Sequence, residues 1–105
     1  MTHLLLQTST DSLSIAKIIA KKLVDKSLSP CVHIINSPIT IYKWEGETIS
    51  TKEYLIQIKT TDSHKTDVIN AIKEDHNYNN PELFSQKINI ESDDYKKWFN
   101  KEMNI

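Results

Sequence analysis

Apolar residues recur at helical spacing in three stretches of the chain, and each stretch follows a residue that favours a helix N-terminus. The three stretches begin near Ser12, at Thr61 or Asp62, and at Ser92. Because residues three or four positions apart lie on one face of a helix, each stretch predicts an amphipathic helix. The expected inner faces carry Ile15, Ile19 and Leu23, then Val68, Ile69 and Ile72, and finally Tyr95, Trp98, Phe99 and Met103.

Four other segments have the alternation or the β-branched composition of strands. They are His3–Thr8, Cys31–Trp44 with a break at Asn36–Pro38, Glu53–Lys59, and Glu82–Ile90. The third alternates most regularly: one face carries Tyr54, Ile56 and Ile58, and the other carries Glu53, Gln57 and Lys59. The stretch Glu45-Gly46-Glu47, which contains the only glycine, predicts a hairpin turn between the second and third strands.

This order of elements predicts an α+β fold in a single domain over residues 1–105. We expect a ferredoxin-like two-layer sandwich, βαββαβ with an added C-terminal helix, in which two helices cover one face of an antiparallel sheet. The polar residues of the third strand would then face solvent or a partner.

The second strand is longer than a small sheet needs, so its end at Tyr42 and Trp44 is expected to project beyond the domain. An indole on a bare hairpin tip exposes a large apolar surface. We therefore expect a neighbouring subunit to cover Trp44.

The charged residues bear on the partners of the chain. All 13 basic residues are lysines, and 14 acidic residues bring the formal net charge to -1. Because arginine is the usual reader of phosphates and guanine edges, we expect no nucleic-acid partner.

The N-terminal apolar run is too short for a signal sequence or a membrane span, so we expect a soluble, unprocessed chain without a membrane partner. Cys31 is the only cysteine, which excludes an intramolecular disulfide and favours a cytoplasmic location.

The sequence carries no catalytic motif. It has no G-x-S-x-G elbow and no P-loop, and a single glycine cannot form a glycine-rich phosphate cradle. We therefore expect that the protein is not an enzyme.

Cys31 and His33 are two residues apart in a predicted strand, so their side chains share a face and form a plausible pair of soft-metal ligands. Alternatively, Cys31 is a small buried residue and His33 an ordinary surface residue. No C-x-x-C or H-x-x-x-H motif indicates a dedicated zinc site. His3 is expected at a strand edge without a role.

The predicted loop before the fourth strand contains His76, Tyr78 and Glu82 around Pro81. Loops at this kind of position often hold polar groups that converge on a cleft. His76 is then either a metal ligand or a pocket donor, or it belongs to a turn formed with Asn79 and Asn80.

Several short segments, taken together and in this order, resemble the CutA divalent-cation tolerance family. They are Cys31-Val32, Ile41–Gly46, Glu53 with Lys59-Thr60, His76–Tyr78 ahead of Pro81–Leu83, and Tyr95–Trp98. The resemblance implies a ferredoxin-like protomer in a homotrimer built like the PII-type signalling proteins, with long hairpins that pair between subunits. It also implies a role in metal tolerance, copper binding in some members, and no established catalytic activity.

The chain departs from the family pattern at three positions. Asn77 replaces the proline of the usual His-Pro-Tyr segment. Copper-binding members carry a cysteine where this chain has Gln7 and a second histidine where it has Asp75. Two expected copper ligands are therefore absent, and Cys31 and His76 are the remaining candidate metal ligands.

Three hypotheses about function follow. The first is a divalent-cation tolerance protein that binds copper or another divalent cation weakly, without an obligatory cofactor. The second is a PII-like regulatory trimer that binds a small anionic ligand in inter-subunit clefts, and the loss of two copper ligands shifts weight toward it. The third is a structural trimer that anchors a protein partner. The cleft of the second hypothesis would contain Trp44, Glu53, Lys59, Tyr78 and Glu82, with Lys59 paired to Glu82 when no ligand is bound.

Overall fold

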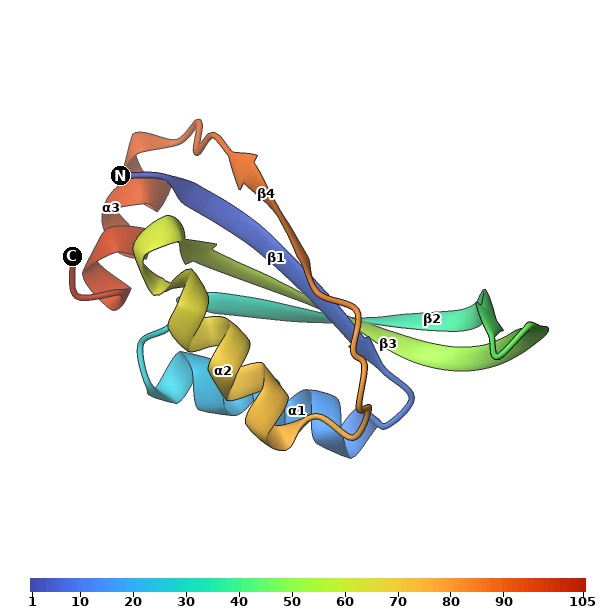
Figure 1. The fold of residues 1–105 in the computed structure, drawn as a ribbon. Coiled ribbons are helices and arrows are strands. Elements are labelled where there is room, and N and C mark those ends of the chain that lie inside the picture. The colour runs from blue at the N-terminus through green and yellow to red at the C-terminus, as the bar shows by residue number, and fades with distance from the viewer.

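A four-stranded antiparallel sheet organises the chain, with the strand order β2-β3-β1-β4. The structure is a computed structural model and describes residues 1–105. The strands are β1 (His3–Thr10), β2 (Cys31–Trp44), β3 (Glu47–Thr61) and β4 (Phe84–Ile88). The helices are α1 (Leu13–Asp25), α2 (Lys65–Asp75), which follows the 3-10 turn η1 (Asp62–His64), and α3 (Asp93–Glu102). Helices α1 and α2 lie on one side of the sheet (Figure 1), so the predicted ferredoxin-like arrangement is confirmed.

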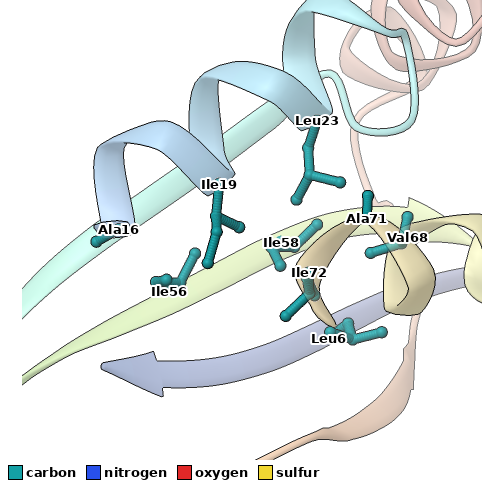
Figure 2. Close-up of a cluster of buried hydrophobic side chains, with 9 residues drawn as sticks. All are labelled: Leu6, Ala16, Ile19, Leu23, Ile56, Ile58, Val68, Ala71 and Ile72. Carbon is teal, nitrogen blue, oxygen red and sulfur yellow. The ribbon is translucent and has the colours of Figure 1, made fainter. Parts of the chain in front are cut away.

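The hydrophobic core fills the space between the sheet and the two helices that cover it (Figure 2). Helix α1 contributes Ile19 and Leu23, which its four-residue spacing places on one face, and Ser12 caps this helix by accepting the N–H of Ile15. The nine buried residues of the core are Leu6, Ala16, Ile19, Leu23, Ile56, Ile58, Val68, Ala71 and Ile72. Alternate residues of β1 and β3 therefore supply the sheet side of the core, as the pattern predicts.

Strand β2 continues through the break expected at Asn36–Pro38. The register with β3 shifts between Ser37 and Thr40, which identifies a bulge rather than an interruption. Strand β2 lies at an edge of the sheet, where a proline without an N–H is tolerated. Strand β3 also begins earlier than expected, at Glu47, so both strands extend into one long hairpin.

The β2–β3 hairpin projects from the domain (Figure 1), and the molecule measures 46 × 25 × 21 Å. At its tip Glu45 and Gly46 both have positive φ, 49° and 82°, as a two-residue type I′ turn requires. The projection predicted for Tyr42 and Trp44 is confirmed, and 49% of the Trp44 surface remains exposed. Ile39 and Ile41, which precede them in β2, are exposed as well.

The second sheet face is not open along its whole length, which corrects the expectation from the sequence. Helix α3 packs on one end of this face, where it buries Phe99 and Met103. His3 is buried there too: its Nε2 lies 3.1 Å from Asn100 Oδ1, and its ring meets that of Phe99 edge-on at 4.9 Å. His3 therefore has a structural task that the sequence did not indicate, because it joins β1 to the closing helix.

No helix of this structure has the length and apolar character needed to cross a membrane.

Candidate functional site

A cavity of about 600 Å³ lies between the β2–β3 hairpin and the segment that joins α2 to β4. Eleven residues line it, and four of the five predicted cleft residues are among them: Trp44, Glu53, Tyr78 and Glu82. Ser9, near the end of β1, also lines the cavity. The sequence thus predicted four residues that line one cavity of the chain, and the predicted location of the cleft between subunits stays a prediction.

The strand period explains why the hairpin contributes several side chains to one wall. Thr40, Tyr42 and Trp44 are two residues apart in β2, so they point to the same face, and all three line the cavity. The opposite wall is the segment 77–82, which passes beside the end of β1 on its way to β4 (Figure 1). Thr40 and Ser9 were missed from the sequence, although the alternation in β2 could have indicated Thr40.

Glu53 is the most unusual residue of the cavity, because it is a carboxylate that is only 5% exposed. Its Oε2 accepts a hydrogen bond of 2.7 Å from the hydroxyl of Tyr78, and it forms no ion pair with any lysine of the chain. Burial, followed by the hydrogen bond to Glu53, raises the pKa of Tyr78 above its usual value. The phenol therefore keeps its proton at physiological pH and remains the donor to this carboxylate.

The segment that carries Tyr78 is fixed by two side chains that precede it. His76 Nε2 lies 2.8 Å from the carbonyl oxygen of Ser9, and His76 Nδ1 lies 2.9 Å from the amide nitrogen of Tyr78. Because a carbonyl can only accept and an amide N–H can only donate, the tautomer of His76 with its proton on Nε2 satisfies both bonds. Asn77 accepts from the hydroxyl of Thr10 at 2.6 Å and donates to Asp11 at 2.8 Å. Asn77 therefore anchors this loop by hydrogen bonds at the position where the family usually has proline.

These bonds change the interpretation of His76. Both of its ring nitrogens are engaged, so it has no free lone pair to offer a metal unless the turn opens. The geometry supports the alternative reading, in which His76 belongs to a satisfied turn, and its role is to position Tyr78.

Lys59 does not line the cavity of the single chain, and its predicted place in a cleft between subunits stays a prediction. It lies six residues from Glu53 in β3, or roughly 20 Å along the strand. Its Nζ is 3.7 Å from the Cys31 sulfur and 5.9 Å from the centre of the Tyr95 ring of α3. Lys59 thus belongs to the end of the sheet face that α3 covers.

The predicted contact between Lys59 and Glu82 is also not made within the chain. Glu82 Oε2 instead accepts from Gln7 Nε2 at 3.2 Å, and Gln7 Oε1 accepts from Gln57 Nε2 at 3.1 Å. The side chains of Gln57 in β3 and Gln7 in β1 thus form a row of amides that ends at Glu82, in the segment before β4. This row of amides lies between the cavity and the end of the sheet that carries Lys59.

The candidate metal ligands do not assemble into a metal centre within one chain. Cys31 Sγ and His33 Nε2 lie 3.8 Å apart, as their shared strand face predicts, but Cys31 and His76 lie at different ends of the sheet. No group of three or more His, Cys, Asp or Glu side chains could hold an ion. The residues present therefore supply at most a two-donor site, Cys31 with His33.

Gln7 and Asp75, at the two positions where the resemblance led us to expect copper ligands, form structural contacts in this chain. Gln7 holds the row of amides described above. Asp75, at the end of α2, lies 3.1 Å from the ammonium of Lys22 in α1 and so joins the two helices. Each replacement thus takes part in holding elements of the fold together.

The chain is similar throughout its length to proteins of one family. The family profile described as "CutA1 divalent ion tolerance protein" matches residues 4–102. A divalent-cation tolerance protein CutA of Thermus thermophilus is 33% identical over 84 residues, which cover 80% of this chain and 82% of that protein.

Solved structures agree with this similarity. The crystal structure of the divalent ion tolerance protein CutA1 from Ehrlichia chaffeensis superposes with a TM-score of 0.89 at 26% identity, covering 98% of this chain and 96% of that one. The structure of the periplasmic divalent cation tolerance protein CutA from Archaeoglobus fulgidus gives a TM-score of 0.90 at 26% identity, covering 96% and 98% of the two chains. Both similarities extend over the cavity as well as the core.

Proposed function

This chain belongs to the CutA1 divalent ion tolerance family, and from that premise we propose that it acts in divalent-cation tolerance as a ligand-binding homotrimer. The ligand site is the cavity between the β2–β3 hairpin and residues 77–82. Metal tolerance is then exercised through a bound small molecule rather than through a metal centre of the protein itself.

The observation that carries this proposal is the buried carboxylate of Glu53. Keeping a carboxylate out of water without a cationic partner is unfavourable, and a bound ligand that carries a compensating charge would relieve this cost at Glu53. A concave cavity in which aromatic rings and convergent polar groups meet is also a usual form of a small-molecule site.

The trimeric part of the proposal is supported by the hairpin. Ile39, Ile41 and Trp44 leave a large apolar surface on an element that nothing in the chain covers. Strand β2 is also an edge strand, whose free backbone groups can pair with another chain. A hairpin that pairs with a neighbouring subunit satisfies both features.

Sedimentation equilibrium tests the assembly. We expect a trimer mass at micromolar concentration, and Trp44→Ala is expected to weaken association by about 2 kcal/mol or more. Trp98→Ala is the control, because Trp98 is partly exposed on α3, far from the hairpin. A monomer mass for the parent protein would refute the trimer.

A fluorescence and thermal-shift screen tests the ligand site. In a Trp98→Phe protein, Trp44 is the only tryptophan, so its emission reports directly on the cavity. Metal ions and small charged metabolites are compared side by side. We expect at least one organic compound to change the Trp44 emission and to raise the melting temperature. If only metal ions do so, the cavity is not the ligand site.

A second candidate function, weak copper binding, is favoured by the approach of Cys31 to His33. A thiolate and an imidazole are suitable donors for copper, but two donors need further ligands from a neighbouring subunit or from solution. Anaerobic titration with Cu(I) is expected to show weak binding that Cys31→Ser removes and His64→Gln leaves unchanged. His76→Ala is expected to leave it unchanged too, and a loss of binding there would restore His76 as the ligand.

A further inference from the structure

The charges and aromatic rings of the cavity allow its ligand class to be specified. We propose that the cavity binds an organic cation, a small molecule with an alkylammonium group, and not an anion. This inference rests on the proposed function, because it takes the cavity to be the ligand site.

The charged side chains of the cavity favour a cation. The cavity is lined by two carboxylates, Glu53 and Glu82, and by no lysine or histidine. Glu53 is almost completely buried, and its only hydrogen-bonding partner, Tyr78, is an uncharged phenol. A charge in such a sheltered place is weakly screened, so it attracts a cation and repels an anion more strongly than a surface carboxylate does. Within one chain this disfavours the anionic ligand of the PII-like hypothesis.

The aromatic side chains of the cavity favour an ammonium group. Tyr42, Trp44 and Tyr78 come from two different segments and face the same cavity. The face of an aromatic ring attracts an ammonium group, and tryptophan does so most strongly. Several rings together with a carboxylate are the combination by which proteins hold alkylated ammonium groups. The half-exposed indole of Trp44 would therefore contribute to ligand binding as well as to the proposed contact with a neighbouring subunit.

The cavity suits an organic cation better than a metal ion. A hard divalent ion needs about six oxygen ligands at short distance, whereas the two carboxylates here are already held by Tyr78 and Gln7. No group of three possible ligands exists in the chain. The volume of about 600 Å³ is also that of a site for an organic molecule rather than for a bare ion. The amides of Asn79 and Asn80 can serve polar substituents of such a molecule.

The test compares choline with 3,3-dimethylbutan-1-ol, in which an uncharged tert-butyl group replaces the trimethylammonium group. The two probes have nearly the same shape, so a difference in affinity measures the charge. Binding to the Trp98→Phe protein is followed by Trp44 emission and by calorimetry. We expect choline to bind about tenfold more tightly or better than the alcohol. Inorganic phosphate and acetate are the anionic probes, and we expect neither to bind.

Glu53→Gln is the decisive variant. The side-chain oxygen of glutamine can still accept the hydroxyl of Tyr78, so the loop is expected to stay in place. The variant is expected to reduce choline affinity about tenfold to that of the alcohol, while the affinity for the alcohol stays unchanged. Glu91→Gln is the matched control, because Glu91 is exposed, forms no ion pair and lies outside the cavity.

The outcomes separate this inference from the proposed function. Equal binding of choline and the alcohol, or tighter binding of phosphate or acetate at the cavity, would overturn the organic cation and leave the cavity as a ligand site. If no probe of any charge changes the Trp44 emission or binds in calorimetry, both proposals fail. The comparison of the two probes on the parent cavity remains decisive even if Glu53→Gln does not fold.

Discussion

The two ends of the second sheet face differ in what covers them, although strand β3 supplies an ionisable residue to both. At one end, helix α3 packs against the sheet, and Lys59 lies against Tyr95 and Cys31. At the other end no helix is present, and Glu53 lies buried beside a cavity with Tyr78 as its partner. The row of amides through Gln7 lies between the two ends.

This difference shows that one face of a small sheet can serve two purposes. The α3 end is filled by apolar packing, so its residues contribute mainly to stability. The cavity end leaves space and a buried carboxylate without a cationic partner in the chain, an arrangement that suits binding and that stability alone does not favour. Variants at the two ends are therefore expected to have different effects, and each is measured by denaturant unfolding at one fixed protein concentration because the assembly affects apparent stability.

Phe99→Ala is expected to have the largest effect of the variants that probe this comparison. Phe99 is fully buried and meets His3 edge-on, so its truncation leaves a cavity and is expected to lower the free energy of unfolding by about 3–5 kcal/mol. Its neighbour Trp98 is 42% exposed, and Trp98→Ala is the control, with an expected loss of about 1 kcal/mol or less. A loss below about 1 kcal/mol for Phe99→Ala would mean that α3 does not close this end.

Tyr78→Phe is expected to have an intermediate effect at the cavity end. It removes the only donor to Glu53, and an unpaired buried acceptor lowers the free energy of unfolding by about 1–3 kcal/mol. Tyr95→Phe is the matched control, because the Tyr95 hydroxyl has no hydrogen-bonding partner in the chain. If the two variants lower the free energy of unfolding equally, the hydrogen bond from Tyr78 to Glu53 does not contribute to stability.

The same variant is expected to change the response to alkaline pH. Burial and the Glu53 hydrogen bond raise the pKa of Tyr78 in the folded chain, whereas in the unfolded chain it stays near 10. Below about pH 10 both states hold the proton, so stability does not depend on it. Above about pH 10 only the unfolded state releases the proton, so the free energy of unfolding falls as pH rises. Unfolding curves between neutral and alkaline pH are expected to show a shallower fall for Tyr78→Phe than for the parent.

Lys59→Ala is expected to have the smallest effect. The lysine is partly exposed and its main contact is the Tyr95 ring, so its loss is expected to lower the free energy of unfolding by about 0.5–1 kcal/mol. Lys52→Ala, which removes a similar contact with Tyr54 on the hairpin, is the control. Binding at the cavity is expected to stay unchanged in Lys59→Ala. If cavity binding disappears instead, Lys59 of one subunit must reach the cavity of another.

The elements of the fold could be predicted from the sequence because their signals are local. The spacing of Ile15, Ile19 and Leu23 defines the inner face of α1, and the caps at Ser12 and Ser92 mark where two helices begin. Gly46 marks the hairpin turn for the same reason, since a positive φ is a property of the turn itself. Order and periodicity of such elements leave few arrangements for a chain of this size.

The candidate site could be predicted only in part. The alternation in β3 places Glu53, Gln57 and Lys59 on one face correctly, but it does not say which parts of that face are covered. For this reason the alternation left open whether Glu53 faces solvent or a partner, and Glu53 is in fact buried within its own chain. Lys59 was assigned to a cleft between subunits, and within one chain it lies outside the cavity.

The sequence by itself determined the order of helices and strands, the faces that enter the core, and the projecting hairpin that carries Trp44. Only the tertiary structure decided the burial of Glu53, the tautomer of His76 and the separation of Lys59 from the cavity. The physical reason is distance along the chain. Periodicity reports contacts within one element, whereas Glu53 meets Tyr78 across 25 residues, His76 meets Ser9 across 67, and His3 meets Asn100 across 97.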